Sequence, residues 1–131
     1  MNSKIKTTFA VVAGAALGAV AIQALHAQAK PPAYVVVDIS EITDPEGYKA
    51  IGQRSNAAAE AVYKELGGRN LARTDKITAL DGTPPKRFVI IAFDSVEKAQ
   101  AYYKSQGQQD VTAIRTKTTK SRSFIVEGLP Q

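Results

Sequence analysis

The sequence predicts an α+β domain preceded by an export leader, and two observations indicate this arrangement. Short β-branched segments alternate along the chain with longer segments in which apolar residues recur every three or four positions, so strands and helices occur in one domain. The first 29 of the 131 residues differ from the rest, because a basic start is followed by a long apolar run. The sequence therefore predicts a leader over residues 1–29 and one domain of ordinary size over residues 30–131.

The leader has the three parts of a secretory signal peptide in the usual order. Lys4 and Lys6 make the start basic, residues 9–25 are apolar, and the small residues Ala27 and Ala29 form a cleavage site. We expect cleavage before Lys30, or before Gln28, and a mature protein in the bacterial periplasm without a stable membrane anchor. The alternative is an inner-membrane anchor made by uncleaved residues 9–25.

The first half of the domain predicts a strand, a helix and a second strand. Residues 34–39 are β-branched and form the strand. Asp44 caps the following helix, Pro45 occupies its first turn, and Gly67 ends it. The second strand covers residues 69–74 and continues, after a bend, over residues 76–80.

The second half adds two strands and one main helix. Residues 87–93 form the third strand after a turn rich in glycine and proline. Asp94 or Ser95 caps the second helix, and a short helical stretch over residues 108–114 follows. Residues 123–127 form the last strand. The resulting order, βαββαβ, is that of the ferredoxin-like fold.

The burial pattern of the strands predicts a homodimer. The two helices cover one face of such a sheet, and a bare face in water should alternate apolar and polar residues. Residues 35–37 and 88–93 are instead apolar on both faces. Because a large exposed apolar patch is unfavourable, we expect two sheets to pack face to face as a two-subunit barrel.

The composition excludes several kinds of chemistry. The chain has no cysteine, and its single histidine, His26, lies in the leader. Zinc sites of the usual kind, Ser-His-Asp triads and Cys-His pairs are therefore excluded, and we expect neither a metal nor a cofactor. The mild positive charge of residues 30–131 and the lack of an RNA-recognition pattern around Phe88 and Phe93 argue against a nucleic-acid partner.

Six short motifs, in order and spacing, carry a resemblance to a known family. They are Gly67-Gly68-Arg69, Leu80-Asp81-Gly82, residues 87–93 with Asp94-Ser95-Val96-Glu97, residues 101–105, Ile114-Arg115 and Val126-Glu127-Gly128. Residues 34–128 thereby resemble domain of unknown function 1330, a branch of the dimeric α/β-barrel superfamily. The resemblance implies a ferredoxin-like fold and a homodimer, and no settled activity. The superfamily includes cofactor-free monooxygenases, haem-degrading enzymes and muconolactone-type isomerases. The mature chain has no histidine for haem iron, and it differs from many relatives in its export signal.

Five residues are candidates for ligand binding: Tyr34, Asp38, Arg73, Arg87 and Tyr102. Asp38 is the one carboxylate in an apolar strand, so it is a weak catalytic candidate as a proton carrier. The arginines offer planar donors for a small anion, with Arg69 expected on the same strand face as Arg73. The alternatives are a satisfied Asp38, arginines paired with Asp75, Asp81 or Glu127, and a Tyr102 at the helix rim.

The basic residues between Asp110 and Glu127 predict a solvated loop before the last strand, with binding of anionic lipid or polysaccharide as the alternative. Three functions remain open for the whole domain. The sequence favours binding of a small molecule in the barrel mouth. The others are a cofactor-independent oxygenase or isomerase and a ligand-free structural or stress-related dimer. Fold alone does not decide among them.

Overall fold

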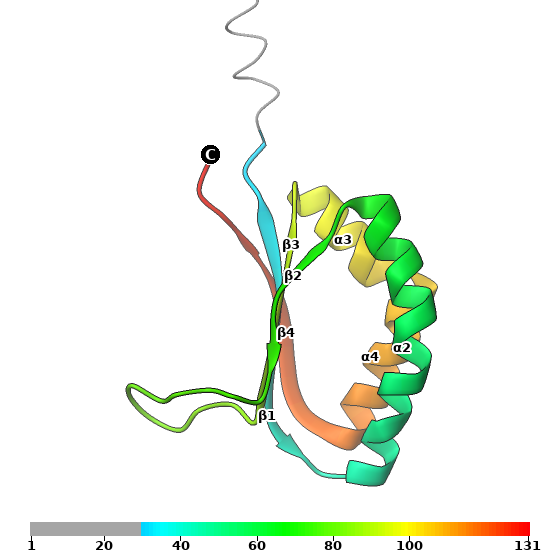
Figure 1. Ribbon diagram of the computed structural model, residues 1–131, viewed down its shortest axis with the longest axis vertical. Helices are drawn as coiled ribbons and strands as arrows, with labels where there is room; N and C mark the ends of the chain where they lie inside the picture. The colour runs from blue at the N-terminus through cyan, green and yellow to red at the C-terminus, as the bar shows by residue number, and fades with distance from the viewer. Residues whose placement is uncertain (1–29) are drawn as a thin grey trace, which may run out of the picture. The chain divides into compact units, whose positions relative to one another are not determined.

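A computed structural model describes residues 30–131, of which residues 53–60 are described by their backbone only. The predicted signal peptide lies outside the described residues. Residues Pro31–Gln131 form one compact unit. Its elements follow in the order β1 (Ala33–Ile42), α2 (Pro45–Leu66), β2 (Arg69–Thr74), β3 (Arg87–Phe93), α3 (Val96–Lys104), α4 (Gln106–Thr118) and β4 (Thr119–Glu127) (Figure 1).

The four strands form one antiparallel sheet in the order β2-β3-β1-β4. Within residues 30–131, helices α2, α3 and α4 lie on one face of this sheet, and no helix of this part of the chain covers the other face (Figure 1). The first strand thus lies in the middle, between two strands that come much later in the chain. This arrangement confirms the α+β class and the ferredoxin-like βαββαβ order.

The ends of α2 follow the predicted signals. The Asp44 carboxylate accepts a hydrogen bond from the Gly47 amide at 3.1 Å, and Pro45 occupies the first turn. Gly67 ends the helix with φ of 69°, a left-handed conformation that glycine adopts without steric cost. For α3 the cap is Ser95, which accepts from the Lys98 amide at 3.2 Å, so the alternative cap Asp94 is not used.

The predicted strand over residues 76–80 is wrong. Residues 75–86 instead form an arm that leaves the sheet on the side away from the helices (Figure 1). Leu80 in this arm is 99% exposed, so no neighbouring strand or core packs against it. Residues that favour β structure form a strand only where a neighbouring strand supplies hydrogen bonds and packing, and the arm has no such neighbour among the described residues.

The region between Asp110 and the last strand is also corrected. It is no solvated loop, because α4 extends to Thr118 and β4 begins directly at Thr119. Tertiary packing lengthens both elements: Thr118 and Thr119 are buried, and the Thr119 hydroxyl donates to the Arg115 carbonyl at 2.7 Å. The basic residues of this region therefore belong to a helix and a strand.

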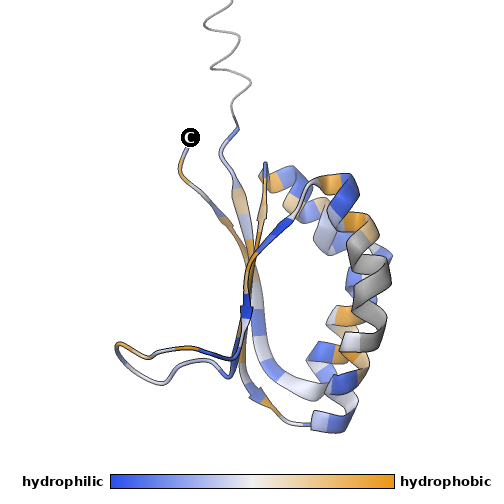
Figure 2. Cartoon of the chain, in the orientation of Figure 1, coloured by the Kyte–Doolittle hydropathy of each residue, from blue (hydrophilic) through white to orange (hydrophobic). Residues whose placement is uncertain are grey.

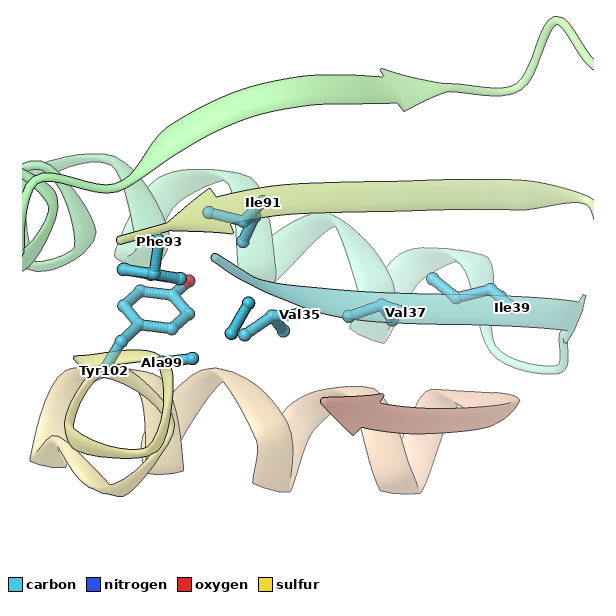
Figure 3. Close-up of a cluster of buried hydrophobic side chains, with 8 residues drawn as sticks. Val35, Val37, Ile39, Ile91, Phe93, Ala99 and Tyr102 are labelled. Atoms are coloured by element: carbon cyan, nitrogen blue, oxygen red, sulfur yellow. The ribbon is translucent and has the colours of Figure 1, made fainter. Parts of the chain in front are cut away.

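The core lies between the sheet and the helices (Figure 3). Val35, Val37 and Ile39 point from β1 into it, as their alternation predicts. Phe93 is fully buried, and its ring centroid lies 5.2 Å from that of Tyr102 at an interplanar angle of 37°. This aromatic contact joins β3 to α3 and fixes the helix over the sheet.

Apolar residues recur along the strands (Figure 2), and the strand registers place some of them on the face away from the helices, as the sequence predicts. Val36 pairs with Ile90 on one side and with Phe124 on the other. Phe124 is 43% exposed and Val126 is 44% exposed. We call this surface the bare face. None of the helices in residues 30–131 is long and apolar enough to span a membrane.

Candidate functional site

A cavity of about 480 Å³ lies on the helix side of the sheet, within the size range of ligand pockets. We call it the helix-side cavity. It is lined by Val37 and Ile39 of β1, Tyr48, Lys49, Ile51 and Gly52 of α2, Arg73 of β2, Arg87, Val89 and Ile91 of β3, Tyr102 of α3, and Gln108, Val111 and Arg115 of α4. Residues from six elements thus line one space, and Tyr102, whose ring contacts Phe93, is one of them.

The lining has an apolar part and a cationic part. The apolar part consists of aliphatic side chains of β1 and β3 on the sheet side and of Val111 on the helix side, from α4. Four cations, Lys49, Arg73, Arg87 and Arg115, line the same space, and no described lining residue is acidic. Such a combination can hold a molecule that has an apolar body and a polar or negative group.

Arg115 is the buried cation of the cavity, with an exposed fraction of 6%. Its Nη2 donates to the Ser123 hydroxyl at 3.2 Å and to the Thr112 hydroxyl at 3.4 Å. No buried side-chain nitrogen or oxygen in the described part of the chain lacks a hydrogen-bond partner. Nε and Nη1 make no hydrogen bond within residues 30–131, so each keeps some contact with solvent.

Arg73 and Arg87 enter the cavity from neighbouring strands. Arg73 donates from Nη2 to the Tyr63 hydroxyl at 3.2 Å and to Asn70 Oδ1 at 3.4 Å. Arg87 is half-buried, opposite Ile39 in the sheet. Within residues 30–131, neither guanidinium forms an ion pair, so the expected alternative of pairing with nearby carboxylates is wrong.

A β-bulge separates two arginines that the sequence places together. The register of β2 shifts between Asn70 and Ala72, so Arg69 pairs with Ala92 and Arg73 pairs with Val89. Ala92 belongs to the bare face and Val89 to the helix face. The expectation that Arg69 and Arg73 share a face is therefore wrong, because one inserted residue reverses the alternation.

Tyr102 lies inside the core rather than at the helix rim. Its hydroxyl donates to Gln108 Oε1 at 2.8 Å, and its ring also contacts that of Tyr63 at a centroid distance of 5.3 Å. Burial raises the pKa of Tyr102, and neighbouring Tyr63 raises it further, while the charges of Arg73 and Arg115 lower it in part. The hydroxyl therefore remains protonated at neutral pH and serves as a hydrogen-bond donor.

We expect the stabilising effect of Tyr102 to disappear in alkaline solution. The folded protein holds the pKa above the ordinary 10.0 of an unfolded chain. The contribution is complete below pH 10 and is lost above it, because only the unfolded state then releases the proton. The difference in unfolding free energy between wild type and Tyr102→Phe should fall by about 1.4 kcal/mol per pH unit above pH 10.

Urea unfolding of both proteins at a series of alkaline pH values measures this slope. Tyr103→Phe is the matched control at the next position of α3, where the side chain is half-buried. A parallel pH dependence of wild type and Tyr102→Phe would contradict the expectation.

Tyr34 and Asp38 lie outside the helix-side cavity, on the bare face. Asp38 pairs with Arg122 of β4, whose Nε and Nη2 both lie 3.1 Å from Asp38 Oδ2. Arg87 lies on the other face, opposite Ile39, and so is not the partner of Asp38. Asp38 also lines a second hollow of about 520 Å³, with Ser40, Thr83, Pro84, Pro85, Lys120, Ser121 and Arg122. The charges of this hollow are already paired, because Lys120 contacts Glu41 at 2.9 Å.

We expect Asp38→Asn to lower the unfolding free energy by no more than about 1 kcal/mol, since the Arg122 side chain is 76% exposed and water screens the pair. Binding in the helix-side cavity should not change. Thermal melts compare this variant with Glu41→Gln, which neutralises the other paired carboxylate of β1. A loss above about 2 kcal/mol would mean that Asp38 is essential to the fold.

Three of the predicted ligand-binding residues, Arg73, Arg87 and Tyr102, line this one cavity. Arg115 and Gln108 line it as well, and they are not among the residues predicted from the sequence. Their signal is present in the chain, because Gln108, Val111 and Arg115 follow the three- and four-residue spacing of one helix face. Because the predicted helical stretch ends at residue 114 and residues 115–122 are predicted as a loop, Arg115 is not assigned to this face in the sequence analysis. Residues 30–131 contain no group of three or more acidic, histidine or cysteine side chains arranged to hold a metal ion.

Several solved structures share the fold. A protein of unknown function from Rhodopseudomonas palustris is 17% identical, with 78% of this chain and 85% of that chain aligned and a TM-score of 0.55. A dimeric ferredoxin-like protein of unknown function from Thermobifida fusca is 13% identical, over 75% and 92% of the two chains, with a TM-score of 0.54. SnoaB, a cofactor-independent oxygenase from Streptomyces nogalater, is 10% identical, over 77% and 96%, with a TM-score of 0.50. At these identities the likeness shows the fold alone.

A comparison with curated proteins gave no match. The family model of a domain of unknown function, DUF1330, matches residues 32–129, which include every strand and helix of the described domain. This match confirms the resemblance carried by the six short motifs. The chain belongs to the DUF1330 family.

Proposed function

We propose that this domain binds a small molecule in the helix-side cavity. The observation that carries the proposal is the combination of aliphatic side chains from β1 and β3 with unpaired arginines in one space of about 480 Å³. The second hollow supports binding less well, because its charged residues already pair and its lining is largely exposed. The helix-side cavity replaces the barrel mouth as the location of the pocket.

Gly52 allows a direct test of this proposal. It lines the cavity, and a Cβ atom there would meet nothing within 4 Å. Gly52→Leu should fill part of the cavity without a backbone clash, whereas Gly52→Ala adds only one methyl group and is the matched control. Both replace glycine inside a helix, which favours folding by about 0.5–1 kcal/mol.

The binding experiment is a fragment screen by NMR on the full chain. We expect apolar fragments to shift amide signals of Val111 and Tyr102 in wild type and in Gly52→Ala, and to do so much less in Gly52→Leu. Fragments that shift only bare-face residues, or that bind Gly52→Leu unchanged, would contradict the location. A screen in which no fragment reaches the cavity at about 1 mM would overturn the proposal.

Binding is favoured over cofactor-independent catalysis by the states of the two residues considered for proton transfer. Tyr102 stays protonated because burial raises its pKa. Asp38 faces away from the helix-side cavity and pairs with Arg122. The oxygenase SnoaB supports a shared fold only, and fold does not imply function.

We further propose that the chain is a homodimer joined through the bare face. The half-exposed Phe124 and Val126 form an apolar surface there, which a second sheet can cover. The solved protein from Thermobifida fusca is described as a dimeric ferredoxin-like protein, in agreement with this assembly. The arm of residues 75–86 lies on the same side of the sheet and can extend along a partner subunit.

Export to the bacterial periplasm is proposed from the leader alone. Cleavage after Ala29 leaves Lys30 as the first residue, and Gln28 is the alternative start. N-terminal sequencing of protein from the periplasmic fraction tests this. Recovery of Met1 from the membrane fraction would instead support an anchor made by residues 9–25.

A further inference from the structure

We propose that the ligand of the helix-side cavity is a small organic carboxylate with an apolar body, held by Arg115, Arg73 and Arg87. This inference rests on the proposed binding function and adds the chemical class of the ligand. It follows from the charge of the cavity, from the open donors of its arginines and from the aliphatic side chains that line the same space.

The charge of the cavity is unbalanced. Lys49 already contacts Glu46 at 3.0 Å, outside the cavity lining. The three arginines have no such partner among the described residues, and they line one space. Arg115 is buried, Arg87 is half-buried and Arg73 is exposed. Positive charges that line one space repel one another, most strongly where they are least solvated, so an anion placed among them relieves this repulsion.

The open donors identify where the anion binds. Arg115 is buried and held in place by Ser123 and Thr112 through Nη2 alone, which leaves Nε and Nη1 available. The Arg87 guanidinium makes no hydrogen bond with the described residues. Guanidinium groups bind carboxylates through two parallel hydrogen bonds, and a group already fixed in position loses little freedom on binding.

The other walls specify the rest of the ligand. Val37, Ile39, Val89, Ile91 and Val111 offer no hydrogen-bonding group to a ligand. A free phosphate or a sugar would leave its polar atoms against this aliphatic surface, at a cost in desolvation. An apolar ring or chain instead gains from burial there, so the ligand combines one anionic end with an apolar body.

The test uses a pair of probes with the same shape and different charge, 2-naphthoate and 2-naphthamide, titrated against the full chain by NMR. We expect the naphthoate to bind at the cavity residues about tenfold more tightly than the amide. Inorganic phosphate, which has charge without an apolar body, should bind at least about tenfold more weakly than the naphthoate.

Charge-removing variants connect the preference to the arginines. Arg87→Gln and Arg115→Gln should each reduce the naphthoate preference over the amide to about threefold or less, with amide binding unchanged. The Arg87 side chain makes no hydrogen bond to another described residue, so its variant remains informative if the Arg115 variant folds poorly. Arg69→Gln, which removes an exposed arginine outside the cavity, is the control and should change neither affinity.

The outcomes separate the two proposals. Equal binding of naphthoate and naphthamide at the cavity residues, or an unchanged preference in Arg87→Gln, overturns the carboxylate inference and leaves small-molecule binding intact. Phosphate that binds as tightly as the naphthoate overturns the apolar body. Absence of both naphthalene probes from the cavity, together with a fragment screen without cavity binders, overturns the proposed function itself.

Discussion

Phe93→Ala is expected to lower the free energy of unfolding by about 3–5 kcal/mol, the largest single effect on stability that the structure predicts. Phe93 is fully buried and lies against Tyr102 with a centroid distance of 5.2 Å. Its removal takes away apolar burial, leaves a cavity between β3 and α3, and ends the ring contact. Domains of this size have a total stability of about 5–15 kcal/mol, so the loss is a large fraction of it.

Urea unfolding followed by circular dichroism measures this loss, at one fixed protein concentration because association adds to apparent stability. Leu80→Ala is the control, since Leu80 is 99% exposed in the arm and its truncation should change stability by less than about 0.5 kcal/mol. A Phe93→Ala protein within about 1 kcal/mol of wild type would show that α3 does not pack on the sheet as described.

Phe124→Lys is expected to convert the proposed homodimer into monomers. Phe124 lies on β4 opposite Val36 and is 43% exposed in a single subunit. Its substitution therefore leaves the subunit core intact, whereas a lysine inside an apolar interface is buried without a partner. The dissociation constant should rise about a hundredfold or more. Val36 is a less suitable position, because it is only 8% exposed and belongs partly to the subunit itself.

Light scattering at micromolar concentration and analytical ultracentrifugation measure the dimer fraction. Ala101→Lys places the same charge at an exposed position of α3, on the helix side, and should leave the dimer unchanged. A wild-type monomer at these concentrations would contradict the assembly, and so would a Phe124→Lys protein that dimerises like wild type.

The elements that could be predicted from the sequence are those with local signals. Asp44, Pro45 and Gly67 fix the ends of α2 by capping and by backbone conformation. The alternation of residues along β1 predicts the burial of Val35, Val37 and Ile39. The prediction of a strand over residues 76–80 failed for a non-local reason, because a segment becomes a strand only if a neighbouring strand supplies hydrogen bonds.

The candidate site was predicted only in part, since it depends on register and on distant elements. The bulge after Asn70 moves Arg73 to the helix face, and no residue type in β2 signals it. Arg115 becomes a cavity residue only because α4 continues beyond Ile114 and is buried against the sheet. Asp38 stood out by its polarity, but its partner Arg122 comes from a strand 84 positions later in the chain.

The place of β1 in the sheet also determines when folding can finish during synthesis. Translation produces β1 first, yet its two neighbours are β3 and β4, and the pair Tyr34 and Val126 joins nearly the two ends of the domain. Contacts between distant parts of a chain form slowly, and the ladder between β1 and β4 cannot close until β4 has left the ribosome. A newly made chain thus keeps an incomplete sheet until β4 has been made, which would suit the export proposed from the leader.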